Sequence, residues 1–335
     1  MTRVAVVILN YNGEKLLSQF LPSVIQHSQG ADIVVADNGS ADQSVNVLQN
    51  FAGVRVELLG ANFGFCGGYN RALKKVNADY YVLLNSDVEV TRDWLKPMLA
   101  VMERHPEVAA VQPKILSWHH RDHFEYAGAG GGFIDTLGYP FCRGRIFDHV
   151  EKDEGQYSDE RQVFWTSGAC MMIRSEKFHE HGGFDEDFFA HMEEIDLCWK
   201  LNRSRSAVFY SGKSSVYHLG AGTLGYHQPR KTYLNFRNGL FLIFKHLDPS
   251  ELLYKLPLRI ALDWLAALSF LLKGEGRNCL SVLRAHRDFL REWKRLKAKR
   301  GMIREKQPSY PRTAIHRGLI IFDYYLRGKR SFPLQ

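Results

Sequence analysis

The first hundred residues alternate between short apolar runs and segments with helical periodicity. Apolar runs rich in β-branched and aromatic residues lie at 4–9, 33–37, 54–59 and 80–85, and helical patterns lie between them at 14–29, 42–51 and 68–76. Strands that alternate with helices favour parallel pairing through right-handed crossovers. The sequence therefore predicts an α/β fold with a Rossmann-like, mixed but mainly parallel sheet and helices on both of its faces.

The periodicity changes twice in the rest of the chain. Residues 118–162 are rich in Gly, His and charge, and we expect them to form a long loop or insertion over the site. A second ordered block follows at 163–220. From about residue 252 the pattern is helical and amphipathic, with apolar and basic positions interleaved. We expect a catalytic domain at 1–250 and a basic, amphipathic helical region at 251–335.

Composition and charge sharpen this division. The chain has 335 residues, of which 45% are hydrophobic, so it can bury a sizeable core, and disorder is excluded. Residues 1–250 hold 25 Lys and Arg against 29 Asp and Glu, whereas residues 251–335 hold 19 against 7. The body is therefore at −4 and the tail at +12. Such a tail is expected to meet an anionic partner, such as a membrane surface or nucleic acid.

The cysteines indicate the redox state of the compartment, and the apolar segments indicate whether the chain spans a membrane. The five cysteines are an odd number without a CxxC pair, which favours a reducing environment and predicts no metal finger. The apolar run at 4–9 is too short for the core of a signal peptide. The apolar stretch at 256–272 is interrupted by Arg259 and Asp263. We therefore predict no transmembrane helix.

Polar residues cluster directly after three of the predicted strands, at 10–13, 37–40 and 85–87. The carboxyl ends of strands in an open parallel sheet line the ligand crevice. Asp87 ends the third cluster, and a carboxylate there suits a hard divalent cation that also holds phosphate oxygens. For Asp87 taken alone, the alternative is an Asx turn at the strand end.

A predicted helix near residue 193 carries three acids, Glu193, Glu194 and Asp196. Because neighbouring residues on a helix point in different directions, we expect Glu193 and Glu194 not to share a proton, and one of them to face the cleft. A carboxylate in that position can act as a general base. The alternative is an acidic first turn that stabilises the helix.

Seven motifs in order carry a resemblance to a known family. They are ILNYNG (8–13), ADNGSADQS (36–44), ANFGFCGGYNRAL (61–73), LLNSDV (83–88), TSGACMMIR (166–174), FDEDFFAHMEEIDLCWK (184–200) and YHLGAG (217–222). Together they resemble the inverting family 2 glycosyltransferases with the GT-A fold, particularly the bacterial branch that includes rhamnosyltransferases. The resemblance covers about residues 3–245.

The resemblance implies a nucleoside-diphosphate-sugar site with Mg2+ or Mn2+. Asp87 matches the last acid of the family's DxD-type motif, Asn85 replaces the first acid, and His218 matches a His of the metal or diphosphate site. The residues implied to contact the donor or to order its loops are Asn10, Tyr11, Asn12, Asp37, Asn38, Asn62, Gly64, Asn70, Asn85, Ser86, Gly168 and Arg237. Arg237 would hold a phosphate through its bidentate fork.

The resemblance also implies which acid is the base. The family has Glu-Asp-x-Asp where this chain has Glu193-Glu194-Ile195-Asp196, so Glu194 stands where the family usually has Asp. Glu194 is then the proposed base, and Asp196 is a second candidate.

The implied function is inverting transfer of a sugar, with rhamnose as the first hypothesis, from a UDP- or dTDP-sugar to a lipid-linked or polysaccharide acceptor. We expect this chemistry at the cytoplasmic face of a bacterial plasma membrane. The basic tail would lie peripherally on anionic lipid or, alternatively, pack on the body, and no nucleic acid is expected. Two other functions stay open: a sugar nucleotidyltransferase, and a non-catalytic, membrane-docked protein of a glycan assembly complex.

Overall fold

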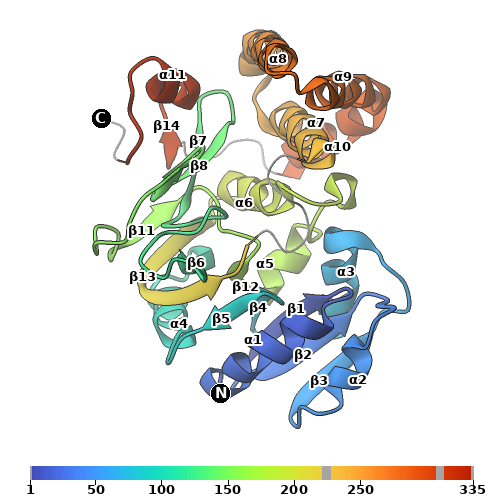
Figure 1. The fold of residues 1–335 in the computed structure, drawn as a ribbon, viewed down its shortest axis with the longest axis vertical. Coiled ribbons are helices and arrows are strands. Elements are labelled where there is room, and N and C mark those ends of the chain that lie inside the picture. The colour runs from blue at the N-terminus through green and yellow to red at the C-terminus, as the bar shows by residue number, and fades with distance from the viewer. Residues whose placement is uncertain (1, 221–227, 307–312, 333–335) are drawn as a thin grey trace.

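The computed structural model describes residues 2–220, 228–306 and 313–332. Its main sheet follows the order β11-β13-β6-β12-β4-β1-β2-β3, with β5 paired to β13 (Figure 1). The bounds are β1 (Val4–Asn10), β2 (Asp32–Asp37), β3 (Val54–Leu58), β4 (Tyr80–Asn85), β5 (Val88–Val90), β6 (Val108–Ser117), β11 (Glu160–Val163), β12 (Cys170–Arg174) and β13 (Ala207–His218). The strand pairs β1–β2, β2–β3, β1–β4 and β6–β13 are parallel, whereas β12 is antiparallel to both β4 and β6. The predicted mixed, mainly parallel sheet is confirmed.

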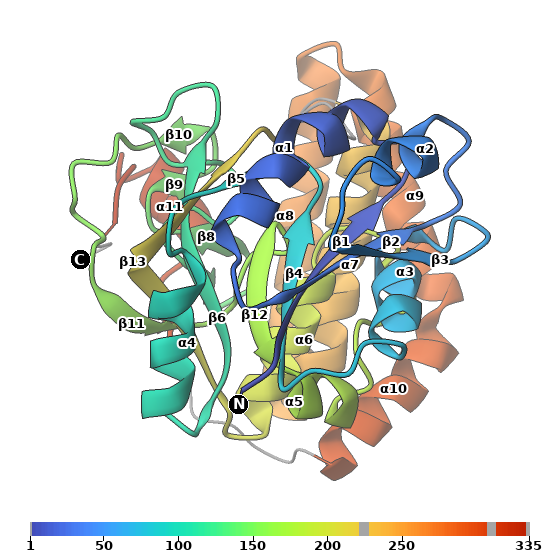
Figure 2. The ribbon, with the colours of Figure 1, turned by 90° about the horizontal axis from the view of Figure 1, so that it is seen from below.

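Helices cover both faces of this sheet because the β1 side chains alternate between two cores. Val4, Val6 and Ile8 pack toward α1 and α4, while Ala5 and Val7 pack toward α3. Figure 2 shows α1 and α4 on one side of the sheet and the C-terminal helices beyond the other. The helices up to residue 203 are α1 (Glu14–His27), α2 (Ser44–Leu48), α3 (Gly64–Leu73), α4 (Leu95–Arg104), α5 (Ser175–Glu180) and α6 (Glu193–Arg203), with a 3-10 turn η1 (Glu186–Phe188).

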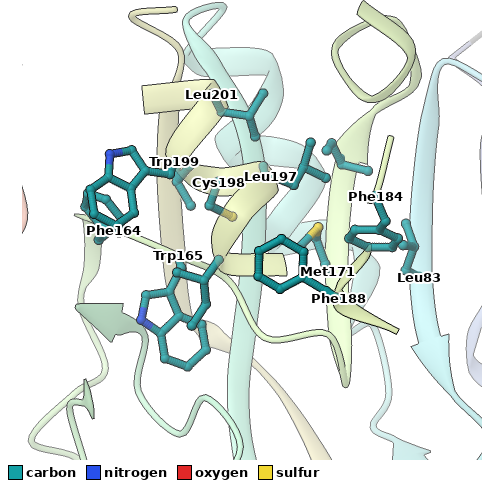
Figure 3. Packing of buried hydrophobic residues seen from close by; sticks show 14 of the residues in the cluster. Leu83, Phe164, Trp165, Met171, Phe184, Phe188, Leu197, Cys198, Trp199 and Leu201 are labelled. Atoms are coloured by element: carbon teal, nitrogen blue, oxygen red, sulfur yellow. The ribbon is translucent and has the colours of Figure 1, made fainter. Parts of the chain in front are cut away.

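Helix α6 is held firmly against the sheet. Leu197, Cys198 and Leu201 are buried among aromatic side chains and the sheet residues Leu83 and Met171 (Figure 3). Tight packing of this kind leaves little freedom to rotate the helix. The acids in its first turn are therefore presented in a fixed direction.

Residues 118–162 correct one expectation. They were expected to be a long loop or insertion over the site, and they are not an irregular loop, because they form short strands of a second sheet with the order β10-β9-β8-β7-β14. The bounds are β7 (Gly132–Asp135), β8 (Pro140–Cys142), β9 (Arg145–Ile146), β10 (His149–Val150) and β14 (Ile315–His316). These strands are two to four residues long, which is too short for a periodic pattern to be detected in the sequence. The tail strand β14 pairs with β7 of the insertion.

Helix α7 (Pro229–His246) is the last helix that lies wholly within the body, and the C-terminal region, which is helical as predicted, packs on it. The helices of the C-terminal region are α8 (Pro249–Leu272), α9 (Gly276–Arg291), α10 (Trp293–Lys306) and α11 (Ile320–Tyr325). Phe289 and Leu296 belong to the larger hydrophobic core, and Phe289 lies 5.7 Å from Phe244 of α7 between ring centroids. Among the described helices, none is long and apolar enough to cross a bilayer.

Candidate active site

The ends of β1 and β2 form a buried polar corner. Parallel pairing places Asn10 opposite Asp37, so both side chains lie at the carboxyl edge of the sheet. Asn10 Nδ2 donates to Asp37 Oδ1 at 3.1 Å, and the Ser40 backbone N–H donates to Asp37 Oδ2 at 3.0 Å. Ser40 Oγ also accepts from the Asn12 N–H at 2.9 Å, while Tyr11 is exposed at the same edge. Sequence reasoning named four of these residues and missed the contribution of Ser40.

One acceptor at this corner lacks a partner. Asn10 Oδ1 is buried, and no donor among the described residues reaches it. A Cβ at position 13 would lie 2.3 Å from this atom, so Gly13 leaves the space around Asn10 Oδ1 open. A buried acceptor without a donor is costly. This atom is therefore suited to receive a donor group from a ligand.

Three asparagines order the neighbouring loop. Asn38 Nδ2 donates to the Gly64 carbonyl at 3.0 Å and to Asn62 Oδ1 at 3.2 Å, and Asn62 Oδ1 accepts from the Gly64 N–H at 2.9 Å. Asn70 exchanges two hydrogen bonds with the backbone of Phe184, at 2.9 and 3.0 Å. Of the two roles expected for Asn62 and Asn70, the structure shows that of ordering the loops.

Asp87, His218 and Glu125 form a buried row of charged groups. Because β5 pairs with β13, His218 lies opposite Val88 and beside Asp87. His218 Nε2 is 3.2 Å from Asp87 Oδ1, and His218 Nδ1 is 3.2 Å from Glu125 Oε2. Burial alone would lower the pKa of His218, but the carboxylates of Glu125 and Asp87 raise it to about 10. Burial would raise the pKa of each carboxyl, yet His218 lowers it below the ordinary value in both.

Sequence reasoning missed Glu125, which lies in the segment expected to be a loop. Within the described residues, no group of three or more His, Cys, Asp and Glu side chains is arranged to hold a metal ion. Asp87 and His218 lie side by side in this part of the chain, and their role as metal ligands stays a prediction. Asn85 and Ser86 precede Asp87, and the Asn85 N–H donates to the Ala169 carbonyl at 3.0 Å. A Cβ at Gly168, beside Ala169, would meet only the ring of Phe65 within 4 Å.

The loop before α6 is strained and held in place by α7. Phe189, His191 and Met192 have φ values of 65°, 67° and 71°, which are unfavourable for residues other than Gly. Asn238 Nδ2 donates to the carbonyls of Phe188, Ala190 and His191 at 3.1, 2.9 and 2.7 Å. Strain of this kind persists only where the surroundings fix the backbone.

Arg237 corrects a second expectation. Its Nη2 donates to the carbonyls of Asp187 and Phe188 at 3.0 Å each, and its Nε donates to Asn238 Oδ1 at 2.9 Å. The guanidinium therefore positions the strained loop instead of presenting a fork to a phosphate. A predicted phosphate contact cannot be distinguished in sequence from a contact with backbone carbonyls, because both use the same donors.

Glu193 and Glu194 begin α6 with weakly acidic carboxyls. Burial, reinforced by the charge of Glu194, raises the pKa of Glu193 well above its ordinary value. Burial raises the pKa of Glu194 to about 7, although backbone N–H groups partly oppose the shift. Each side chain has a buried Oε2 without a hydrogen-bond partner among the described residues. The two carboxyls interact electrostatically even though they start from adjacent positions on the helix.

Asp196 is an anchor, which contradicts its role as the second candidate base. It is fully buried; Lys245 Nζ donates to its Oδ1 at 2.5 Å, His246 Nε2 lies 2.8 Å from the same oxygen, and Lys200 Nζ is 3.1 Å from Oδ2. Burial would raise the pKa of Asp196, but Lys200 and Lys245 bring it well below its ordinary value. A carboxylate held in this way is a poor proton acceptor.

Removing the cation at this anchor is expected to destabilise the protein strongly. Lys245→Met removes the closest cation of the buried Asp196 and leaves it with Lys200 at 3.1 Å. Breaking a buried ion pair by removal of one partner costs about 3–5 kcal/mol. Lys96→Met is the control, because Lys96 pairs with Asp93 on the surface, where both side chains are exposed. We expect urea unfolding to give a large loss for Lys245→Met and wild-type behaviour for Lys96→Met. Equal stability of the two variants would contradict the anchor role.

A family model for "Glycosyl transferase family 2" matches residues 5–182, which is more than half of the chain. The chain belongs to this family. The family 2 assignment confirms the predicted resemblance, and the enzyme is a glycosyltransferase. The match includes β1, β2 and Asp87 but ends before Glu193 and His218.

Two curated relatives are rhamnosyltransferases. The N-acetylglucosaminyl-diphospho-decaprenol L-rhamnosyltransferase of Mycobacterium tuberculosis is 28% identical over 66% of this chain and 77% of its own length. Rhamnosyltransferase WbbL of Escherichia coli K12 is 23% identical over 75% of this chain and 94% of its own length. The two matches therefore cover about two thirds and three quarters of this chain.

Solved structures confirm the GT-A fold. GalNAc-T7 with UDP, GalNAc and Mn2+ has a TM-score of 0.58 at 18% identity, over 74% of this chain and 49% of that chain. TarS 1-349 of S. aureus has a TM-score of 0.55 at 16% identity, over 98% of this chain and 92% of that one. The mannosyltransferase PcManGT from Pyrobaculum calidifontis, in complex with GDP-Man and Mn2+, has a TM-score of 0.54 at 14% identity, over 91% and 87%. At these identities the likeness concerns the fold alone.

Proposed function

We propose that this family 2 enzyme transfers a sugar, with rhamnose from dTDP-rhamnose as the first hypothesis and a UDP-sugar as the alternative donor, with inversion, to a lipid-linked or polysaccharide acceptor in cell-surface glycan assembly. One observation carries the proposal most directly: the row Asp87–His218–Glu125 lies at the carboxyl edge of the sheet that also presents Asn10 and Asp37. Both curated relatives are rhamnosyltransferases, which supports rhamnose, and the mycobacterial one acts on a diphospho-decaprenol acceptor, which supports a lipid-linked acceptor.

The chemistry of the residues fits Mg2+ or Mn2+. Asp87 would supply a hard carboxylate, and His218 would supply an imidazole nitrogen once the cation displaces the proton that Nε2 shares with Asp87; both residues are buried at a strand end. Two protein ligands leave positions for phosphate oxygens and water, as such cations prefer beside nucleotides. When bound, the ion would stabilise negative charge on the leaving diphosphate. Glu125 would hold the other nitrogen of His218 and so fix the orientation of the ring.

This arrangement predicts that Glu125→Gln weakens metal binding. A carboxylate behind a metal-ligating His typically contributes about 10–100-fold to metal affinity. We expect the Kd for Mn2+, measured by calorimetry with UDP or dTDP present, to rise by about tenfold or more. Glu89→Gln is the control, because Glu89 lies two residues from Asp87 but pairs with Arg121. If both variants bind Mn2+ like the wild type, Glu125 has no role in orienting His218.

The polar corner is proposed to read the pyrimidine base. Uracil and thymine both carry an imide N–H and carbonyl oxygens. Asn10 Oδ1, which is buried and without a donor among the described residues, is free to accept that N–H. Asp37 holds Asn10 in this orientation through the 3.1 Å hydrogen bond. Asn85, Ser86 and Gly168 remain proposed contacts of the sugar nucleotide.

Glu194 is proposed as the base. In inverting transfer, the acceptor hydroxyl attacks the anomeric carbon from the face opposite the diphosphate, and a carboxylate takes its proton. A pKa of about 7 matches this task, because the group is ionised in part at neutral pH and is still basic enough to take the proton. The loop fixed by Arg237 and Asn238 would set the position of Glu194.

The site of action is proposed to be the inner face of a bacterial plasma membrane. A lipid-linked acceptor requires the enzyme to work at a bilayer surface, and the tail carries the positive charge that anionic headgroups attract. The enzyme would bind there peripherally.

Binding of the sugar nucleotide provides the test of the proposed function. We expect dTDP-rhamnose or a UDP-sugar to raise the Tm of the purified protein by several degrees with Mn2+ and much less with EDTA. GDP-sugars serve as the comparison for recognition of the base. If no sugar nucleotide raises the Tm in the presence of Mg2+ or of Mn2+, the proposed sugar-nucleotide site is refuted.

A further inference from the structure

Helix α8 has the reverse of the usual distribution of polar and apolar side chains. Its charged residues after the first turn, Lys255, Arg259 and Asp263, are at most 5% exposed. Eight of its large apolar and aromatic side chains point outward with exposures between 44% and 81%, whereas Leu256 is buried in the core. The outward-pointing residues are Leu253, Tyr254, Leu258, Trp264, Leu265, Leu268, Leu271 and Leu272, and we call them the α8 face. A helix that presents its apolar side to the outside requires an apolar partner.

The buried charges fix this orientation. Arg259 Nε donates to Asp263 Oδ1 at 3.1 Å, and Arg259 Nη1 donates to the Leu137 carbonyl at 3.3 Å. The Arg259 guanidinium also lies 3.6 Å from the ring centroid of Tyr139. On α9, His286 Nε2 is 3.2 Å from Asp263 Oδ2. Turning α8 over would break this buried network, so the α8 face is a fixed surface of the catalytic body.

Cations predominate around the α8 face. Lys273, Arg277, Arg284 and Arg287 are exposed, whereas the acids nearby, Glu275 and Asp288, are only partly exposed, and Asp288 pairs with Arg287 at 2.9 Å. Helix α9 packs against α8 and adds exposed Leu280 and Leu283 beside these arginines. Apolar side chains bordered by cations are typical of helices that lie in the headgroup region of an anionic bilayer.

We propose that the α8 face docks the enzyme on an anionic lipid bilayer, with α8 lying in the plane of the membrane. This inference rests on the proposed function and specifies which surface meets the lipid. The 24 residues of α8 make a helix about 36 Å long, which would lie along the membrane surface. Exposed Trp264 suits the boundary between acyl chains and headgroups.

Charge complementarity favours lipid over a second copy of this chain. A twofold symmetric contact centred on the α8 face would set two surfaces bordered by the same cations, Arg277 and Arg284, against each other. Like charges brought together destabilise such a contact. Anionic headgroups would instead neutralise these arginines.

The proposal also relocates the predicted membrane contact. Phe289, an aromatic residue of the basic, amphipathic region, is buried in the body and is not accessible to lipid. The stretch around Arg259 and Asp263, excluded as a span because of these charges, supplies the apolar surface instead.

The test compares full-length variants in sedimentation with vesicles. Leu265→Glu/Leu268→Glu places two charges on the α8 face at positions exposed by 62% and 50%, so folding should be retained. Leu58→Glu is the matched control, because Leu58 is 58% exposed on β3, far from α8 in Figure 1. Vesicles contain either phosphatidylglycerol with phosphatidylcholine or phosphatidylcholine alone. Tm, sedimentation velocity and Mn2+-dependent binding of the sugar nucleotide are measured on the same preparations.

We expect wild type and Leu58→Glu to bind vesicles that contain phosphatidylglycerol. The partition coefficient of the double variant should be lower by about tenfold or more. Equal binding by the double variant, or no binding by wild type, would overturn the proposal. The proposal would also be overturned if the wild type is a dimer that does not bind vesicles and the double variant is a monomer. That result would assign the α8 face to self-association. Sugar-nucleotide binding should be unchanged in all three proteins, so failure of the proposed function is detected separately.

Discussion

Asp87→Ala is expected to abolish metal-dependent turnover of the sugar nucleotide. The substitution removes the carboxylate of the proposed cation site and leaves His218 paired with Glu125 alone. Loss of a cation that neutralises a leaving diphosphate costs several kcal/mol, so we expect a fall in kcat/KM of about 10³-fold or more, equal to roughly 4 kcal/mol. Release of the nucleoside diphosphate, followed by chromatography with Mg2+ or Mn2+ present, measures this effect.

Asp32→Ala is the matched control for Asp87→Ala. Asp32 begins β2 at the opposite edge of the same sheet and is exposed. Its removal should leave turnover unchanged. If Asp87→Ala retains the wild-type rate and the wild-type dependence on Mn2+, the cation is held elsewhere.

Glu194→Gln is expected to stop transfer while leaving sugar-nucleotide binding intact. The amide has nearly the same shape as the carboxyl but cannot take a proton from the acceptor hydroxyl. A general base contributes about 10²–10⁴-fold, so kcat should fall by that factor. The Kd for the sugar nucleotide, measured by calorimetry, should stay within about twofold of the wild-type value. The reason is that Asn10, Asp37 and Asp87, which are proposed to form the sugar-nucleotide site, are unchanged.

The pH profile tests the same assignment. A base must be ionised to act, and the pKa of Glu194 is raised to about 7. The wild-type kcat/KM should therefore be low at pH 6, rise through pH 7 and level off above it. Glu194→Asp restores the residue usual in the family and should keep part of the transfer activity. Full transfer by Glu194→Gln would show that another group, such as Glu193, is the base.

The sequence predicted those parts of the site that follow from regular elements. Asn10, Asp37 and Asp87 come directly after apolar strands, and parallel pairing places their strand ends at one edge. The strand pattern alone therefore sufficed to bring these side chains together. His218 was predicted from the resemblance, and pairing of β5 with β13 places it beside Asp87.

Other parts depend on long-range packing that no local pattern reveals. Glu125 lies 93 positions before His218 in a segment of very short strands, so nothing around it marks it as a partner. Asp196 and Glu194 are two residues apart in an acidic turn, and only the approach of Lys245 from α7 distinguishes an anchor from a base. For Arg237, the sequence specified the donors but could not specify the acceptors.

The tail shows a different limit. Helical periodicity shows that two faces of α8 differ, but it does not state which face meets the protein. Apolar residues usually face the core, and α8 instead buries Arg259 and Asp263 through specific partners on other segments. This reversal required the tertiary structure.

Transfer to acceptor lipid tests the central claim most directly. Purified wild-type protein would be incubated with bacterial membrane vesicles, which supply the acceptor, and with dTDP-rhamnose labelled in the sugar. The reaction would be run with Mn2+ or with EDTA. Labelled UDP-sugars and GDP-sugars would be tested in parallel. The account predicts label in the lipid extract from dTDP-rhamnose or a UDP-sugar with Mn2+, and none with EDTA or with Asp87→Ala. Absence of label from every donor, or incorporation unaffected by EDTA, would contradict it.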